Sequence, residues 1–237
     1  MILGEDGQKM SKSRGNVANP EEIMDTYGAD SVRLYEMFMG PLEMTKPWNT
    51  SGVEGVYRFL GKVWRMFMDQ NGKLNANIED REPTAQELKI LHKAIKKVTE
   101  DTEGMRFNTA ISAMMVFTNE MGDIQTRSKK TLTDFLILLA PYAPHIAEEL
   151  WQKMGHPDTI AYEPWPKWDE SVLKEDTLEL AVLVGGKVKC KITVPAGDSE
   201  ENIRKLALDQ PDVQKALVGK TAKQIIIVPG RIVNIVI

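Results

Sequence analysis

Apolar residues recur at steps of three and four along much of the stretch between residues 49 and 155, which is the spacing of one helix face. The first stripe lies in a helix expected from Asn49 to Gln70 and consists of Val53, Val56, Leu60, Val63 and Phe67. The second follows a capping-box sequence from Thr84 to Glu87 and consists of Leu88, Leu91, Ile95 and Val98. Both stripes predict amphipathic helices that bury one side.

Further helical segments are predicted in the second half of this stretch. Asn108 is expected to cap one helix, and another should begin near Thr131. Pro141 and Pro144 separate the latter from a last segment that ends at Gly155. Together with the two stripes above, these segments predict an all-α bundle of four or five helices. A region rich in proline and tryptophan follows, and we expect it to cover the bundle without regular structure.

The hydrophobic period changes from 3.6 to 2 near residue 177, so the last part of the chain is predicted to form a small α+β domain. Two strands, 178–184 and 187–194, flank Gly185-Gly186, a pair typical of a tight hairpin turn. Two short helices and a second hairpin, with its turn at Pro229-Gly230, complete a ββααββ order.

Strict alternation in the second of these strands places Val188, Cys190, Ile192 and Val194 on one face. Lys187, Lys189 and Lys191 should then share the other face, where their ammonium groups could contact the phosphates of an RNA. An ordinary solvated surface gives the same pattern. The same two interpretations apply to the basic side of the second predicted helix, with Lys89, Lys93, Lys96 and Lys97.

The beginning of the chain is expected to hold a loop and two short helices. Asn19 and Pro20 are typical of a helix start, and Gly28 should end that helix. Asp30 is expected to cap the next helix, which should end at Gly40-Pro41.

The chain is therefore predicted to be multidomain and mostly α. We expect three parts, at residues 1–47, 48–172 and 177–237, with a charged tether around residues 174–176. The hydrophobic content of 42% is enough to bury real cores. A formal net charge of −4 excludes a protein held on nucleic acid by its overall charge.

Cysteine content and hydropathy limit the kinds of site and the cellular location that we expect for the protein. Cys190 is the one cysteine in the sequence, which excludes an internal disulfide and a multi-cysteine zinc cluster. The apolar runs are shorter than a membrane-spanning helix requires. We expect a cytoplasmic protein that does not contact membranes.

The loop at residues 4–15 carries the candidate chemistry. Lys9 and Lys12 alternate with Ser11 and Ser13, and glycines flank them. Ammonium groups and hydroxyls can hold phosphate oxygens, and charge that develops on a leaving pyrophosphate would be stabilised there. The alternative interpretation is a disordered basic arm.

The three histidines are expected to have structural roles. His92, His145 and His156 are far apart in the sequence and lack the spacing of metal ligands. They also do not form a pattern of nucleophile, base and orienting acid. We therefore predict no metal site in this chain.

The loop and its flanks resemble a known family. The sequence from Gly4 to Asn16 resembles the second signature, KMSKS, of class I aminoacyl-tRNA synthetases, and Tyr27-Gly28-Ala29-Asp30 follows it as in that family. The segments Phe107–Ile111 and Leu138–Trp151 are similar to the anticodon-binding bundle of the leucine, isoleucine and valine enzymes. The end of the chain looks like the C-terminal domain of bacterial leucyl-tRNA synthetases, and isoleucyl- or valyl-tRNA synthetases remain the alternatives.

The resemblance implies ATP-dependent activation of leucine, followed by transfer to tRNA(Leu), in an enzyme expected to use Mg²⁺ and to be a monomer. Lys12 would be the main cation on the pyrophosphate and Lys9 a second contact, while Ser11 and Ser13 would bind phosphate or fix the loop. The family's first signature, His-Ile-Gly-His, does not occur in this sequence. We therefore expect the C-terminal part of a longer ligase, inactive alone and without tight ATP binding, or alternatively a non-catalytic RNA-binding module.

Overall fold

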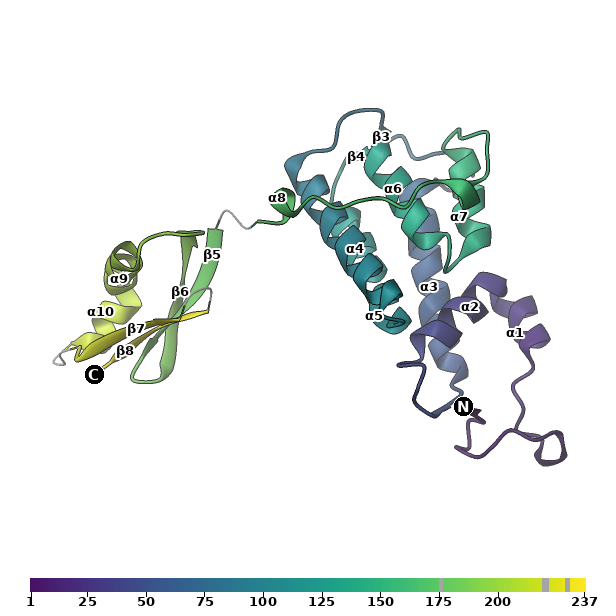
Figure 1. The fold of residues 1–237 in the computed structure, drawn as a ribbon, viewed down its shortest axis with the longest axis horizontal. Helices are drawn as coiled ribbons and strands as arrows, with labels where there is room; N and C mark the ends of the chain where they lie inside the picture. Colours follow the sequence, from purple (N-terminus) through teal and green to yellow (C-terminus); the bar gives the residue numbers. More distant parts are fainter. Residues whose placement is uncertain (175–176, 219–221, 229–230) are drawn as a thin grey trace. The chain divides into compact units, whose positions relative to one another are not determined.

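The computed structural model describes residues 1–174, 177–218, 222–228 and 231–237 (Figure 1). The chain divides into two compact units, Met1–Leu173 and Lys174–Ile237. Two of the expectations above, most of the charged tether and the Pro229-Gly230 turn, lie outside the described residues.

The first unit is built mainly from α-helices, with two short strand pairs and two 3-10 helices among its described residues. Its helices are α1 (Pro20–Tyr27), α2 (Ala29–Phe38), α3 (Thr50–Phe67), α4 (Ala85–Glu103), α5 (Phe107–Gly122), α6 (Lys129–Leu139), α7 (Pro144–Lys153) and α8 (Glu170–Leu173). Parallel pairs join β1 (Ile2–Leu3) to β2 (Lys46–Pro47) and β3 (Ile78–Glu79) to β4 (Arg127–Ser128). Short 3-10 helices occupy Lys12–Arg14 and Ile160–Tyr162.

Helices α3 to α7 form the predicted bundle around one hydrophobic core (Figure 1). The predicted stripe of α3 is buried, and so is most of the stripe of α4. Phe117 of α5 stacks on Phe135 of α6, with ring centroids 4.2 Å apart. Trp165 and Trp168, from the stretch expected to cover the bundle, pack against the same core. The sequence pattern therefore predicted the bundle correctly.

The boundaries of α3 differ from the prediction at one end only. Asn49 caps the helix as expected, because its side chain accepts a hydrogen bond from the backbone N–H of Ser51. The helix ends at Phe67 and not at Gln70. Asn75 is the reason, since its Nδ2 donates to the carbonyls of Arg65 and Met66 and closes the helix there.

The predicted cap at Asn108 is wrong. Helix α5 begins at Phe107, and Arg106 stands at the cap position without a side-chain capping bond. The Arg106 guanidinium instead donates from Nε to Asp101 and from Nη2 to the carbonyl of Glu100. These bonds hold the short turn between α4 and α5. The helix therefore starts one residue before Asn108, which lies inside its first turn and cannot cap it. Helix α6 likewise begins earlier than expected, at Lys129.

Asp30 does not cap α2 as predicted. Gly28 occupies that position, and the buried carboxylate of Asp30 reaches the start of α7 instead. It accepts hydrogen bonds from the backbone N–H groups of Ile146 (2.8 Å) and His145 (3.3 Å). The start of α7 has no capping side chain of its own, because Ala143 precedes it. Asp30 thus binds the first 47 residues to the bundle.

Tyr35 makes a second connection between these parts. Its ring meets Trp48 edge to face, with centroids 4.9 Å apart, and its hydroxyl accepts a hydrogen bond from Asn49 N at 3.1 Å. The ring also lies directly on Gly52, where an added Cβ would fall 2.4 Å from Tyr35 Cε2. Gly52 is therefore required for α2 to approach the start of α3.

The second unit has the predicted ββααββ order. Its elements are β5 (Thr177–Val184), β6 (Lys187–Pro195), α9 (Glu200–Leu208), α10 (Pro211–Leu217), β7 (Gln224–Val228) and β8 (Ile232–Val236). The sheet order is β6-β5-β8-β7, with β5 and β8 parallel and the other pairs antiparallel. Gly185 and Gly186 have φ values of 57° and 78°, as the predicted hairpin turn requires.

The alternation predicted for β6 is interrupted by a bulge. Val182 pairs with Cys190, but Leu183 pairs with Val188, so Lys189 has no partner on β5. Lys187 pairs with Val184, which lies on the buried face, whereas Lys191 pairs with Ala181 on the other face. Val188 is consequently 61% exposed and not on the buried face as predicted. The three lysines do not share one face of the strand.

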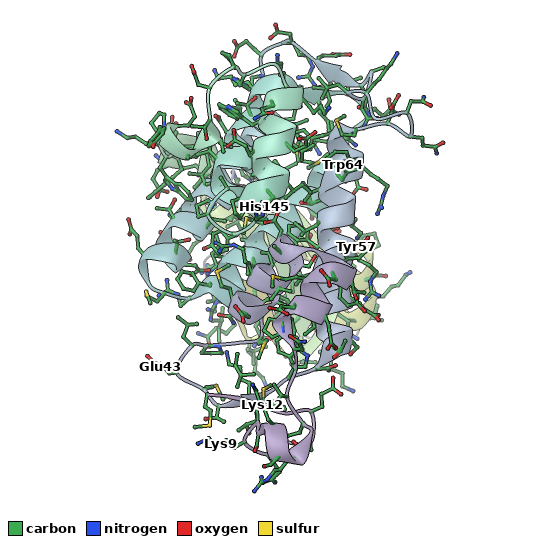
Figure 2. The ribbon with its side chains drawn as sticks, turned by 90° about the vertical axis from the view of Figure 1, so that its right-hand side faces the viewer. Lys9, Lys12, Glu43, Tyr57, Trp64 and His145 are labelled. Atoms are coloured by element: carbon green, nitrogen blue, oxygen red, sulfur yellow. The ribbon has the colours of Figure 1, made fainter. Side chains whose placement is uncertain are left out.

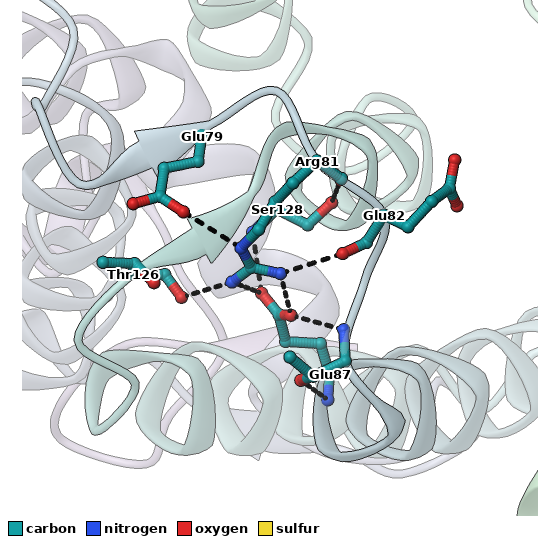
Figure 3. A network of polar contacts seen from close by, with 7 residues as sticks. Glu79, Arg81, Glu82, Glu87, Thr126 and Ser128 are labelled. Atoms are coloured by element: carbon teal, nitrogen blue, oxygen red, sulfur yellow. Dashed lines mark hydrogen bonds and ion pairs between the residues drawn. The ribbon is translucent and has the colours of Figure 1, made fainter.

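A buried ion pair fastens the connection between α3 and α4 to the bundle (Figure 3). Glu87 is completely buried and receives two hydrogen bonds from Arg81, at 2.7 and 3.2 Å. The N–H groups of Thr84 and Ser128 donate to the same carboxylate, each at 2.7 Å. Arg81 also binds Glu79 and the carbonyl of Thr126. The predicted capping box is therefore confirmed, and it extends into a wider network.

The pKa of Glu87 follows from this network. Burial alone would raise the pKa, but the hydrogen bonds from Arg81, Thr84 and Ser128 outweigh it and lower the pKa from 4.5 to about 2. Because the folded-state pKa lies below the unfolded value, the resulting stability is complete above about pH 4.5 and is lost as pH falls toward 2.

We expect Glu87→Gln to lower the free energy of unfolding at pH 7 by roughly 3 kcal/mol, because Arg81 loses its buried charged partner and keeps only the exposed Glu79. The loss should shrink as pH falls from 4.5 toward 2, since the wild-type carboxylate is then protonated. Urea unfolding at several pH values measures both effects. Glu82→Gln is the matched control, because that side chain is exposed and should change stability by less than about 0.5 kcal/mol. A pH-independent difference would contradict this account.

Candidate functional site

The predicted phosphate loop is a short hairpin in the structure. Leu3 and Lys9 form an antiparallel bridge, and Gly4 and Gln8 are joined by a backbone hydrogen bond of 2.8 Å. The chain then turns through the 3-10 helix at Lys12–Arg14, which ends at Gly15 with a φ of 69°. This positive φ is readily adopted only by glycine.

The predicted phosphate ligands lie together on this hairpin. The side chains of Lys9, Lys12 and Ser13 are exposed, and Ser11 is half-buried. Across the part of the chain that the structure describes, no carboxylate lies within 4 Å of either ammonium group. The hydroxyls of Ser11 and Ser13 lie 2.8 Å apart, within hydrogen-bond distance. Figure 2 shows Lys9 and Lys12 at the lower end of the unit. Both cations are therefore available to an anion.

The hairpin is attached to the bundle at several points. Met10 is partly buried and packs against the hydrophobic core. Glu5 Oε1 accepts hydrogen bonds from Thr50, at 2.7 Å from Oγ1 and 3.0 Å from the backbone N–H. These bonds lower the pKa of Glu5. The loop is thus linked to the first turn of α3.

A cavity of about 580 Å³ lies beside the hairpin, on the side of α1. Its lining includes the carboxylates of Glu5, Asp6 and Glu22, but neither Lys9 nor Lys12. Like charges repel, so this acidic cavity is unsuited to phosphate. The exposed side of the loop is where the cations can meet an anion.

The loop residues do not fit a site for the implied Mg²⁺. Hard cations need several oxygen ligands, but the carboxylates of Glu5 and Asp6 are occupied by Thr50, Gln8 and Asn16. No group of three His, Cys, Asp or Glu side chains able to hold a metal ion occurs among the described residues.

A groove of about 600 Å³, which was not predicted from the sequence, lies where α2, α3 and α7 meet. Tyr57, Trp64 and Arg65 line it from α3, and His145 lines it from α7 (Figure 2). Tyr57 is 51% exposed although it is a large aromatic residue. A signal was present in the sequence, because Tyr57 and Trp64 are seven residues apart and so lie on the same side of a helix. An exposed aromatic side chain beside a half-buried one and a basic one suits the bases and phosphates of RNA.

The lysines considered for RNA contact are not equivalent. Lys191 Nζ lies 2.6 Å from Glu179, an ion pair that raises the pKa of Lys191. Lys187 and Lys189 have no carboxylate within 4 Å among the residues described. On α4, Lys96 pairs with Glu170 and Lys97 with Asp101.

Each of the three histidines makes a contact within the fold. His92 Nδ1 accepts a hydrogen bond from Asp169 N at 2.8 Å, and His145 Nδ1 lies 2.8 Å from Asp30. The His156 ring stacks on Trp151, with centroids 3.7 Å apart. Burial lowers the pKa of His156 and raises that of the Cys190 thiol.

In the described parts of the chain, every helix is too short or too polar to cross a membrane.

Two family models match the chain. The model for class I tRNA synthetases (I, L, M and V) matches residues 1–44, which contain the loop. The model for the anticodon-binding domain of tRNA ligase matches residues 87–204.

Two relatives extend these matches over nearly the whole chain. The leucine–tRNA ligase of Rhodopirellula baltica is 50% identical over 232 residues, which is 97% of this chain and 24% of that protein. The AgnB2 LeuRS of Agrobacterium radiobacter K84, solved as a ternary complex with tRNA and LeuAMS, aligns with a TM-score of 0.79 and 33% identity. That match covers 100% of this chain and 32% of the LeuRS chain. The chain therefore spans about a quarter to a third of the length of these relatives, and it belongs to the leucyl-tRNA synthetase family.

Proposed function

We propose that this chain is part of a ligase that activates leucine with ATP and transfers it to tRNA(Leu). The leucine carboxylate attacks the α-phosphorus of ATP, the bond to the β-phosphate oxygen breaks, and pyrophosphate leaves. A ribose hydroxyl of the tRNA then attacks the leucyl carbonyl, and AMP leaves. The observation that carries this proposal is the exposed KMSKS loop, whose two ammonium groups have no carboxylate within 4 Å among the described residues, in a chain related to leucine–tRNA ligases.

The loop would act on the pyrophosphate side of the first step. Lys12 would lie against the pyrophosphate as negative charge develops on it, and Lys9 would make a second phosphate contact. Ser11 and Ser13 lie within hydrogen-bond distance of each other and could turn toward phosphate oxygens. Because neither lysine is paired with a carboxylate in the described structure, their charge is not offset before ATP arrives.

The three parts expected from the sequence receive separate roles in this proposal. Residues 1–47 would be the end of the catalytic domain, residues 48–172 the anticodon-binding bundle, and residues 177–237 a tRNA-binding domain. The groove between Tyr57, Trp64 and His145 would contact tRNA on the bundle. Leucine and the adenosine of ATP would bind to parts of the ligase that this chain does not contain, in a cytoplasmic, monomeric enzyme.

Lys12→Ala should slow leucine-dependent ATP–pyrophosphate exchange by roughly 10²- to 10³-fold, because one preorganised contact to the transition state is lost. The exchange is measured in a full-length ligase that contains this stretch. Lys73→Ala, which removes an exposed lysine in the turn after α3, is the control and should leave the rate unchanged. Near-normal exchange by the Lys12 variant would overturn the proposed role.

Binding of tRNA(Leu) to the second unit should depend on salt through Lys187 and Lys189 more than through Lys191. Each phosphate contact that is lost should reduce the slope of log K against log salt by about 0.7–0.9. Lys191→Ala should have a smaller effect, because Glu179 already neutralises that charge. Titrations of the chain with tRNA(Leu) at several NaCl concentrations measure the slopes, with Lys205→Ala as the control. Unchanged slopes in all three variants would show that these lysines are only solvated and do not contact tRNA phosphates.

A further inference from the structure

We propose that Asn16 is a positioning residue for the KMSKS loop and holds Lys9, Ser11 and Lys12 in the geometry that the adenylation step requires. This inference rests on the function proposed above. It assigns to Asn16 no contact with ATP, because its polar side-chain atoms are already used within the hairpin.

The Asn16 side chain bonds to both sides of the loop at once. Its Oδ1 accepts a hydrogen bond of 2.8 Å from the backbone N–H of Ser11. Its Nδ2 lies 3.3 Å from the carbonyl of Lys9, to which it donates. The same Nδ2 lies 3.1 Å from both carboxylate oxygens of Asp6. One half-buried amide thus joins the turn before the signature to the residues inside the signature.

The space around this amide is an independent observation. Gly4 is buried, and a Cβ placed on it would lie 2.8 Å from the carbonyl oxygen of Asn16 and 2.9 Å from its Nδ2. The same Cβ would lie 2.8 Å from Asp6 Oδ1. Contacts this short do not occur for real side chains, so the absence of a side chain at Gly4 is what lets Asn16 and Asp6 meet. Asp6 in turn accepts from the backbone N–H of Gln8 at 2.9 Å.

A neutral amide is suited to this position for an electrostatic reason. An acidic side chain here would add a negative charge to the loop that carries Lys9 and Lys12, and so offset the positive charge that phosphate needs. Asp6 is close as well, but its carboxylate is engaged by Gln8 and Asn16, bonds that lower the pKa of Asp6. Asn16 therefore fixes the backbone at Lys9 and Ser11 without using the ammonium groups or hydroxyls. A misplacement of about 1 Å in such groups can cost about 10²-fold in rate.

Three variants separate positioning from folding. Asn16→Ala removes all the side-chain bonds. Asn16→Asp keeps the shape and the acceptor for Ser11 N but sets two carboxylates against each other. The double variant Asp6→Asn/Asn16→Asp swaps the amide and the carboxylate. It should restore the hydrogen bond between positions 6 and 16 and part of the loop geometry. Asn19→Ala is the matched control, because it removes an amide that caps α1 and does not touch the loop.

The first readout uses the 237-residue chain and needs no activity. Hydrogen exchange of the Ser11 amide, followed by NMR, should be at least 10-fold faster in Asn16→Ala than in the unmodified chain. In Asn19→Ala it should be unchanged. Equal protection of Ser11 in Asn16→Ala would overturn the proposal, and Asn16→Leu, which keeps the size of the side chain but has no acceptor for Ser11 N, gives the same test if the alanine variant does not fold.

The second readout is ATP–pyrophosphate exchange in a full-length ligase that contains the chain. Asn16→Ala should lower kcat by about 10- to 100-fold while the KM for ATP changes less than 3-fold, and the double exchange should recover at least part of kcat. An unchanged kcat with an unprotected Ser11 would refute the positioning role. If instead Lys12→Ala retains full exchange, the proposed function fails, whereas the hydrogen-exchange result for Asn16 stands by itself.

Discussion

The loop-bearing beginning of the chain depends on the contact of Tyr35 with Trp48 and Gly52. Helices α1 and α2 are too few to enclose a core of their own, and their apolar residues join the core of the bundle. The Tyr35 ring can reach α3 only because Gly52 has no side chain, and its hydroxyl fixes Asn49, the residue that caps α3. This packing, together with Asp30 at the start of α7, gives the hairpin a rigid support.

Charge around the hairpin is divided between groups that build the loop and groups that remain available. Glu5 is used by Thr50, and Asp6 is used by Gln8 and Asn16. Lys9 and Lys12 take part in none of these bonds. A chain with a net charge of −4 can therefore present a local cationic surface, because Glu5 and Asp6 of the same hairpin are held in hydrogen bonds of the fold.

The second unit illustrates how a single irregularity changes a surface. The bulge at Lys189 lets β6 follow β5 while it rotates the first residues of the strand by one face. Lys187 and Lys191 are separated by this rotation, and Lys191 is paired with Glu179. Any RNA that binds here would meet Lys187 and Lys189 as the free cations in the described part of the strand.

The sequence by itself determined the elements with strong local signals. The apolar stripe of α3, the capping box at Thr84 and the Gly185-Gly186 turn were all predicted, because each is encoded by residues within a few positions of one another. Tertiary structure alone decided that Asp30 accepts hydrogen bonds from the start of α7, where the β6 bulge falls, and how Asn16 joins Asp6 to Ser11. These features depend on groups that are far apart in the sequence and close in space, such as Asp30 and Ile146. A pattern within a few neighbouring residues cannot predict such a contact.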